Sequence, residues 1–412
     1  MAAIVAGAAR ASRVPQGGAM EHSAARIPAI CPERPAPRRP GARLRRLGLA
    51  LLLAGCAADE PQRDAWPRPQ DSRALLLQLL PTNLSDRAGW ATDIYAAFSA
   101  LQIPPTASNF CAALGVIEQE SSFQADPAVP NLGAIARKEI DERAGRVGVP
   151  SLLVSAALQI PSSDGRSYAE RIDKARTERQ LSETFEDLIE RVPLGQRLFG
   201  KLNPVRTGGP MQVSVAWAEA NTQRYPYPLD GGVRQAVFTR RGGLFFGIAH
   251  LLDYPAPYDR PLYRFADFNA GRWASRNAAF QQALSRASGI PLDTDGDLLR
   301  GDGQRGATEA AALLMAPRLG LSESEARRAL EQGNEPGFER SALYRKVFER
   351  AERNEGRALP RAVLPDIALS GPKISRPLST KWFAERVQQR WQRCMARAPA
   401  GASASRTSSP EP

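Results

Sequence analysis

Apolar residues recur at intervals of three and four positions along most of the chain, and strand-like alternation is rare. Such intervals place apolar side chains on one face of a helix. Residues 106–127 show the pattern most clearly, because Phe110, Leu114 and Ile117 fall on a common face. A brief alternation at residues 211–215 is compatible with a strand. The pattern predicts a mainly α fold with at most a small hairpin, and 412 residues allow two or three structural units.

A carboxylate interrupts the apolar face of residues 106–127. Glu120 follows Ile117 by three positions and continues the face, whereas Glu118 points to the opposite side at about 100° per residue. Desolvation raises the pKa of a carboxyl group, which allows it to donate a proton near neutral pH. Glu120 is therefore a candidate general acid, and the alternative is a helix-end side chain that turns to water. Thr106 or Ser108 can cap the start of this helix.

Three short blocks resemble, in the same order, the motifs of soluble lytic transglycosylases and goose-type lysozymes. They are ESSFQADP at residues 120–127, GPMQV at residues 209–213 and ADFNAG at residues 266–271. The apolar stretch at residues 244–252 is similar to the helix that this family places between the last two. The resemblance covers about residues 83–287 and implies a lysozyme-like fold. The chain as a whole resembles uncharacterised proteobacterial lipoproteins that carry these blocks around a long insertion.

The resemblance also implies a reaction and its residues. Glu120 would protonate the oxygen between N-acetylmuramic acid and N-acetylglucosamine, and its carboxylate would then deprotonate the muramoyl 6-hydroxyl. This closes a 1,6-anhydro ring without consuming water. The residues that would bind the glycan are Ser121, Met211, Gln212, Phe268 and Asn269. The implied activity is that of a lytic murein transglycosylase, and neither a metal site nor any other cofactor is expected.

The third block departs from the family at one position. Phe268 stands where the family usually has tyrosine, whose hydroxyl group reaches the catalytic carboxyl group. Losing one such hydrogen bond costs about 1 to 3 kcal/mol, which would slow an enzyme without abolishing its activity. A neighbouring tyrosine can supply the hydroxyl group instead. The candidates are Tyr225, Tyr227, Tyr254 and Tyr263.

A long insertion separates the first two blocks. Glu120 and Gln212 are 92 positions apart, whereas the family joins these blocks by a short loop. About seventy residues, at positions 136–206, are therefore inserted. Helical spacing recurs within them at residues 137–143, 151–158, 168–179 and 182–191. The insertion would form either a wall of the glycan groove or a packed addition with no role in binding.

Two other functions stay open at this point. A hydrolytic muramidase would need a second carboxylate to position water. The candidates for it are Asp126, Glu139, Glu219 and Asp267. The other function is that of a catalytically inactive peptidoglycan-binding envelope lipoprotein, which Phe268 and the insertion would permit.

The N-terminal region has the pattern of a secretory signal. Three arginines precede the apolar run at residues 47–54, which is far shorter than the roughly 20 residues of a membrane-spanning helix. The run ends in LAGC, which resembles a bacterial lipobox, so Cys56 is expected to be acylated and to anchor the chain in a membrane. Ala57 resembles the residue found after the lipid-bearing cysteine in outer-membrane lipoproteins. We therefore expect the chain to be anchored at the periplasmic face of the outer membrane, with the inner membrane as the alternative location.

The predicted organisation follows from these segments. It comprises a leader (1–55), a linker (56–71), a lysozyme-like domain (72–289) containing the insertion, a C-terminal helical region (290–398) and a disordered tail (399–412). The leader holds nine arginines and two acids, so its removal lowers the net charge from +12 to about +5. Without a basic and aromatic run, nucleic acid is not an expected partner. The expected partners are the glycan strands of peptidoglycan, and no protein partner is predicted.

Cysteine and histidine usage adds two expectations. After removal of the leader and acylation of Cys56, Cys111 and Cys394 remain. They either form a disulfide in an oxidising periplasm or stay as two buried thiols. His250, the one histidine beyond the leader, lies in an apolar helical segment and is expected in the core. Residues 293–304 begin like a calcium loop but lack its glycine and its final glutamate, so we expect a polar loop there.

Overall fold

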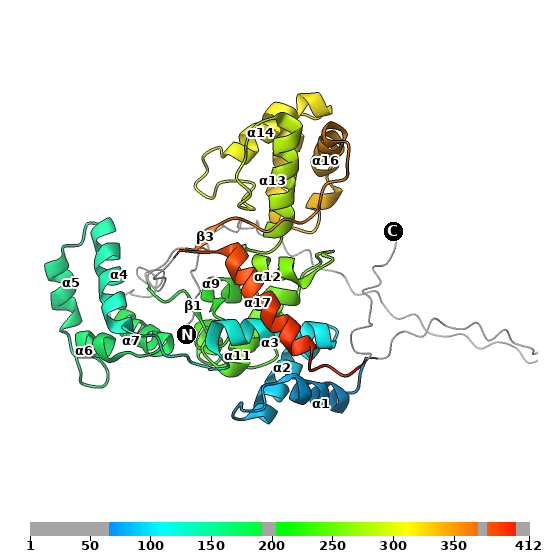
Figure 1. Ribbon diagram of the computed structural model, residues 1–412. Coiled ribbons are helices and arrows are strands. Elements are labelled where there is room, and N and C mark those ends of the chain that lie inside the picture. Colours follow the sequence, from blue (N-terminus) through cyan, green and yellow to red (C-terminus); the bar gives the residue numbers. More distant parts are fainter. Residues whose placement is uncertain (1–65, 192–202, 370–376, 401–412) are drawn as a thin grey trace, which may run out of the picture. The chain divides into compact units, whose positions relative to one another are not determined.

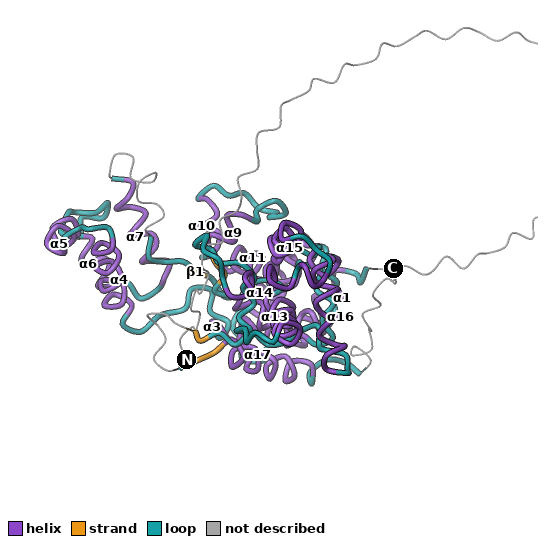
Figure 2. The backbone as a smooth tube through the Cα atoms, turned by 90° about the horizontal axis from the view of Figure 1, so that it is seen from above, coloured by secondary structure: helices purple, strands orange, loops and turns teal. Residues whose placement is uncertain are grey.

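The computed structural model describes residues 66–191, 203–369 and 377–400 (Figures 1 and 2). All of them except Trp66 belong to one compact unit. Helices dominate and the strands have two residues each, which confirms the mainly α fold. The predicted leader, Cys56 and nearly all of the predicted tail lie outside these residues. No helix in the described ranges is long and apolar enough to cross a membrane.

The first hydrophobic core joins helices from both ends of the chain. They are α1 (Pro69–Leu79), α2 (Arg87–Leu101), α3 (Ala107–Ser121), α11 (Arg240–Leu252), α12 (Pro261–Ala270) and α17 (Thr380–Met395). The last helix, α17, packs along α3 and α12, and both views place it beside α3. Its residues Phe383, Val387 and Cys394 are buried at helical spacing. Although it comes from the predicted C-terminal region, α17 therefore completes the core that holds Glu120.

Caps set the ends of α3. The Thr106 hydroxyl group accepts a hydrogen bond from Asn109 N at 3.2 Å, so Thr106 rather than Ser108 is the N-cap. At the other end, Ser122 and Phe123 adopt left-handed conformations with φ of 51° and 62°. These two residues end the helix directly after Glu120 and Ser121.

Short elements follow the insertion. The strands β1 (Thr207–Gly208) and β2 (Val213–Ser214) pair antiparallel, with Gly208 opposite Val213. The expected hairpin is therefore present, and Met211 and Gln212 occupy its turn. Two short helices come next, α9 (Val215–Ala220) and α10 (Gly232–Val237). A second pair of strands, β3 (Ala368–Leu369) and β4 (Leu378–Ser379), precedes α17.

A second core joins α13 (Ala274–Ser288), from the end of the predicted lysozyme-like domain, to helices of the predicted C-terminal region. The other elements are α14 (Ala307–Met315), α15 (Glu323–Glu331), α16 (Ala342–Glu355) and the 3₁₀ helices η2 (Pro317–Leu319), η3 (Gln332–Asn334) and η4 (Phe338–Arg340). Arg276 of α13 is fully buried and donates to the carbonyl oxygen of Glu335 at 2.9 Å. Its guanidinium also lies over the rings of Trp273 and Phe338.

The insertion has a third core of its own. It is built from α4 (Leu132–Arg146), α5 (Ser151–Leu158), α6 (Tyr168–Lys174) and α7 (Glu178–Glu190). The helix boundaries expected near residue 180 are wrong. Arg176 O accepts from Val129 N at 2.8 Å, and Thr177 caps α7, so the chain is extended between α6 and α7. Tertiary hydrogen bonding thus overrides the helical spacing, and Ser182 lies inside α7 instead of capping it.

Candidate active site

Glu120 lies in the last turn of α3, and its side chain is 0% exposed. The neighbouring Ser121 is also buried, and its hydroxyl group donates to Ile117 O at 3.1 Å. Phe123, after the turn, packs edge-on against Trp90 with ring centroids 5.6 Å apart. The carboxyl group of Glu120 therefore lies on the buried side of α3, as its position in the apolar stripe predicts.

The Met211–Gln212 turn is held by its own segment and by α11. Met211 is fully buried against Gly247, where a Cβ atom would lie 2.5 Å from Met211 Sδ. Only glycine therefore lets α11 approach this turn so closely. Gln212 has a φ of 52°, and its side-chain amide accepts from the Thr207 hydroxyl group at 3.2 Å. Its amide nitrogen donates to Gly209 O at 3.4 Å, so the side chain of Gln212 braces the hairpin.

Phe268 and Asn269 occupy the last turn of α12. The Phe268 ring lies between His250, at 5.2 Å, and Phe383 of α17, at 6.4 Å between centroids. The side-chain oxygen of Asn269 is buried and accepts no hydrogen bond from the described residues. Asn269 therefore has a side-chain acceptor that is unused by the described residues.

Two of the tyrosines proposed to replace the missing hydroxyl group have other partners. Tyr254 donates its hydroxyl proton to Asp267 at 3.0 Å, and the hydroxyl oxygen of Tyr263 accepts from Arg260 at 3.2 Å. The ring of Tyr225 stacks on Phe246, with centroids 5.0 Å apart. The hydroxyl groups of Tyr254 and Tyr263 therefore already have hydrogen-bond partners.

The structure brings the elements of the three blocks together in one core. Ile117 of α3, Met211 of the hairpin turn and Phe268 of α12 all belong to the first hydrophobic core. The side-chain hydrogen bonds from Ser121 to Ile117 and between Gln212 and Thr207 or Gly209 stay within their own segments. The shared hydrophobic core therefore joins the elements that carry the three blocks.

Asp267 is a buried carboxylate with a structural role. It accepts from the hydroxyl groups of Tyr254 and Tyr258 at 3.0 and 2.7 Å, and from the backbone N–H groups of Trp273 and Ser275 at 3.0 and 2.7 Å. Burial raises the pKa of Asp267, while these hydrogen bonds act to lower it. The carboxylate thereby ties the end of α12 to the start of α13, and its oxygen atoms are already occupied by donors.

The other carboxylates that a hydrolase would need are placed differently. Asp126 forms an ion pair with Arg179 at 3.0 Å, and Glu139 pairs with Arg143 at 2.7 Å within α4. Glu219 is exposed on α9. With Asp267 also engaged, three of the four candidates form structural contacts, and Glu219 is the one that is exposed.

Two arginines of α17, which the motifs did not indicate, lie beside Glu118 in the last turn of α3. Arg393 donates to Glu118 at 3.0 Å, and Arg390 lies 3.5 Å from the same carboxylate. Burial lowers the pKa of Arg390, and the charges of Glu118 and Glu120 act in the opposite direction. The arginines at positions 386, 390 and 393 recur at helical spacing, but their partner helix could not be known without the packing of α17.

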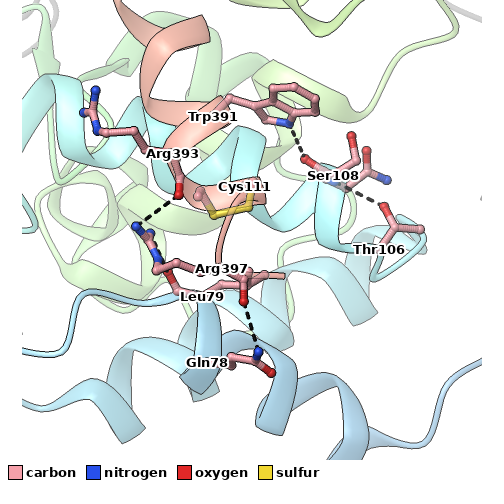
Figure 3. The surroundings of a disulfide bond; sticks show 10 residues. Gln78, Leu79, Thr106, Ser108, Cys111, Trp391, Arg393 and Arg397 are labelled. Carbon is pink, nitrogen blue, oxygen red and sulfur yellow. Dashed lines mark hydrogen bonds between the residues drawn. A yellow bond between two sulfur atoms is a disulfide. The ribbon is translucent and has the colours of Figure 1, made fainter. Parts of the chain in front are cut away.

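The two cysteines fasten α17 to α3 (Figure 3). Cys111 and Cys394 form a disulfide with a Cα–Cα distance of 5.5 Å. Nearby, Trp391 Nε1 donates to Ser108 O at 3.1 Å, and the Arg397 guanidinium donates to Leu79 O at 2.7 Å. These contacts hold the C-terminal helix against α1 and α3, so the position of Arg390 beside Glu118 is fixed by a covalent link.

His250 sits behind Phe268. Its Nε2 lies 3.2 Å from Phe268 O, and its ring packs edge-on against Trp217 at 4.8 Å. Burial, together with the charge of Arg272, lowers the pKa of His250 to about 3. The histidine is therefore neutral in the folded protein at physiological pH, with Nε2 as the donor to the carbonyl oxygen.

This shift predicts a pH dependence of stability. An unfolded histidine titrates near pH 6.5, so between pH 6.5 and 3 the unfolded chain binds one more proton than the folded chain. The contribution of His250 to stability is full above pH 6.5 and is lost as the pH falls. We expect the free energy of unfolding to drop by about 2 kcal/mol between pH 7 and pH 5.

Urea unfolding at both pH values measures this loss, and His250→Gln is the control because it removes the titrating group. The variant should lose clearly less stability over the same interval. Equal losses in both proteins would contradict the assignment. An NMR titration of the imidazole gives an independent check, since residues 57–412 contain a single histidine.

These features define a mainly helical protein with a buried carboxyl group at the end of α3. The chain belongs to the family described as a protein of unknown function, DUF1615, whose model matches residues 83–397. It is similar to the uncharacterized protein YaiW of Escherichia coli (strain K12), with 54% identity over 347 residues that cover 84% of this chain and 95% of that protein. No solved structure matches the chain. The family match includes the insertion and the second core.

Proposed function

We propose that the protein is a lipid-anchored peptidoglycan lytic transglycosylase in which Glu120 is the sole acid and base. The observation that carries this proposal is the full burial of the Glu120 carboxyl group at the end of α3, in the core to which the other two blocks also contribute. A carboxyl group removed from water suits general acid catalysis. The lysozyme-like fold belongs to the same proposal.

In this mechanism Glu120 first gives its proton to the oxygen of the glycosidic bond. The carboxylate then takes the proton of the muramoyl 6-hydroxyl group, and that oxygen attacks the anomeric carbon to close the anhydro ring. Arg390 would stabilise the carboxylate between the two proton transfers, because opposite charges attract strongly when they are partly buried. The side-chain amide of Asn269 would form a hydrogen bond with the glycan. Since Glu120 is 0% exposed, glycan binding must displace the side chains that cover it.

One observation favours a second candidate, a peptidoglycan-binding lipoprotein without catalysis. Phe268 lacks the hydroxyl group that soluble lytic transglycosylases usually have at this position. A hydrolytic muramidase is less favoured, because Asp126, Glu139 and Asp267 are held in structural contacts.

The envelope location is part of the proposal. Acylation of Cys56 would anchor the chain at the periplasmic face of the outer membrane. The Cys111–Cys394 disulfide supports export, because such bonds persist in oxidising compartments. In that compartment the glycan strands of peptidoglycan are the available substrate.

Digestion of purified sacculi tests the function. The unacylated mature chain, residues 57–412, is incubated with sacculi and the released fragments are analysed by mass spectrometry. A transglycosylase releases fragments with 1,6-anhydro ends, and a muramidase releases reducing ends. Binding to sacculi without any released fragment would support the non-catalytic lipoprotein instead.

A further inference from the structure

The helix that carries Glu120 ends in an unusual turn. Ser122 and Phe123 both have left-handed backbone conformations, with φ of 51° and 62°. Residues other than glycine seldom adopt this conformation, because it costs free energy and persists only where neighbouring contacts enforce it. Strained residues of this kind concentrate at active sites. The turn directly after Glu120 and Ser121 therefore needs contacts that hold it.

The ring of Phe123 supplies one such contact. It packs edge-on against Trp90 of α2, with ring centroids 5.6 Å apart and an angle of 80° between the ring planes. Aromatic pairs in this arrangement attract one another beyond the gain from burial alone. Trp90 is buried and belongs to the first hydrophobic core, so it offers the turn a fixed surface.

Arg240, at the start of α11, contacts Trp90 and ties it to two carboxylates. Its guanidinium lies 5.5 Å from the centroid of the Trp90 ring, which is within the range of a cation–π contact. Arg240 Nε donates to Asp93 at 2.7 Å, and its Nη1 donates to Asp86 at 2.7 Å. Asp93 is only 6% exposed, so water competes little for its hydrogen bonds. A series of contacts therefore runs from α11 through Trp90 to the turn after Glu120.

The next residue, Arg241, makes similar contacts that lead elsewhere. Its Nε donates to the other carboxylate oxygen of Asp93 at 3.3 Å, and its guanidinium lies 4.6 Å from the centroid of the Tyr227 ring. That ring packs against Tyr225, with centroids 5.5 Å apart. Of these two neighbouring arginines, Arg240 is the one that contacts the ring on which the turn after Glu120 rests.

We propose that Arg240 is a positioning residue for Glu120 and acts through Trp90 and Phe123. By fixing the ring against which Phe123 packs, Arg240 holds the left-handed turn and the last turn of α3. The Glu120 carboxyl group then meets the glycosidic oxygen in a single orientation, which contributes strongly to the rate. This inference rests on the proposed transglycosylase activity, and Arg240 itself takes no part in proton transfer.

Fragment release from sacculi tests the effect on the reaction. Arg240→Gln in the unacylated mature chain should lower the initial rate by about tenfold, because a small displacement of a reacting group slows the reaction strongly. Binding of the chain to sacculi, measured by sedimentation, should stay within about twofold, since the proposed contacts act on the turn and not on the glycan. Arg240→Lys keeps a charge beside Trp90 and should lower the rate by only about threefold.

Arg241→Gln is the matched control. It also removes an ion pair with Asp93 and a cation–π contact, but its ring partner does not hold the turn after Glu120. We expect this variant to keep the rate to within about twofold, because an exposed ion pair contributes little to stability.

Two further measurements separate positioning from a general loss of stability. Amide hydrogen exchange, followed by mass spectrometry, should be at least about fivefold faster at residues 118–124 of Arg240→Gln and unchanged there in Arg241→Gln. Phe123→Leu removes the ring through which Arg240 acts. In that background Arg240→Gln should lower the rate little further, because both changes interrupt the same series of contacts. Circular dichroism verifies the fold of each variant.

Three results would overturn the inference. One is equal rates for Arg240→Gln and Arg241→Gln, and another is independent, multiplicative losses from Arg240→Gln and Phe123→Leu. The third is unchanged hydrogen exchange at residues 118–124 of Arg240→Gln, because other contacts would then hold the turn. If the unaltered chain releases no fragments, the proposed activity is wrong instead, and hydrogen exchange alone decides whether Arg240 holds the turn.

Discussion

Glu120→Gln should lower the release of anhydro-ended fragments from sacculi by about 10³-fold or more. A general acid or base contributes roughly 10² to 10⁴ to the rate, and here one carboxyl group would perform both proton transfers. Glutamine has nearly the same shape but cannot exchange a proton with the substrate. The measurement is the initial rate of fragment release by the unacylated mature chain and its variant.

Glu118→Gln provides the matched control for this change. Glu118 is two positions away on the same helix, and it pairs with Arg393 on the surface rather than facing the core. The control should retain the rate to within about twofold, since a surface ion pair contributes little to stability. Equal rates for Glu120→Gln and the unaltered chain would exclude Glu120 as the acid.

Removing the Cys111–Cys394 disulfide should lower the free energy of unfolding by about 5 kcal/mol. The bond closes a loop with a sequence separation of 283 residues, and a crosslink of that span strongly restricts the unfolded chain. Both cysteines are buried, so the bond also fixes α17 against α3. Denaturant unfolding with and without a reductant measures the difference.

The double variant Cys111→Ala/Cys394→Ala separates the bond from other effects of the reductant. It should unfold at the lower denaturant concentration whether or not reductant is present, whereas the unaltered chain should respond to reductant. If reductant leaves the unfolding midpoint of the unaltered chain in place, the disulfide does not stabilise the fold as proposed.

Local patterns predicted the helices that carry their own apolar stripe. The spacing of Phe110, Leu114 and Ile117 placed Glu120 on the buried face of α3, and the structure has α5 at the residues where its spacing put it. These features depend on neighbours three or four positions away, which the sequence displays directly. The buried face of α3 is therefore the part of the candidate site that could be derived in advance.

The other features of the candidate site depend on contacts between residues that are far apart in the chain. The role of Asp267 depends on two tyrosine hydroxyl groups and on backbone N–H groups at the start of the next helix. The sequence alone does not show whether a carboxylate is solvated or accepts four hydrogen bonds. Likewise, α17 is separated from α3 by more than 250 residues, so the proximity of Arg390 to Glu118 had no local signal. The break between α6 and α7 also arose from a tertiary hydrogen bond, the one between Val129 and Arg176.

The most direct test of single-carboxylate catalysis is digestion of sacculi in ¹⁸O-labelled water. Ring closure by the muramoyl 6-hydroxyl group takes no oxygen from the solvent, so we expect anhydro-ended fragments without ¹⁸O. Hydrolysis places one solvent oxygen at the new reducing end. Fragments carrying ¹⁸O, or no fragments from a folded chain, would contradict the proposal that Glu120 acts alone as acid and base.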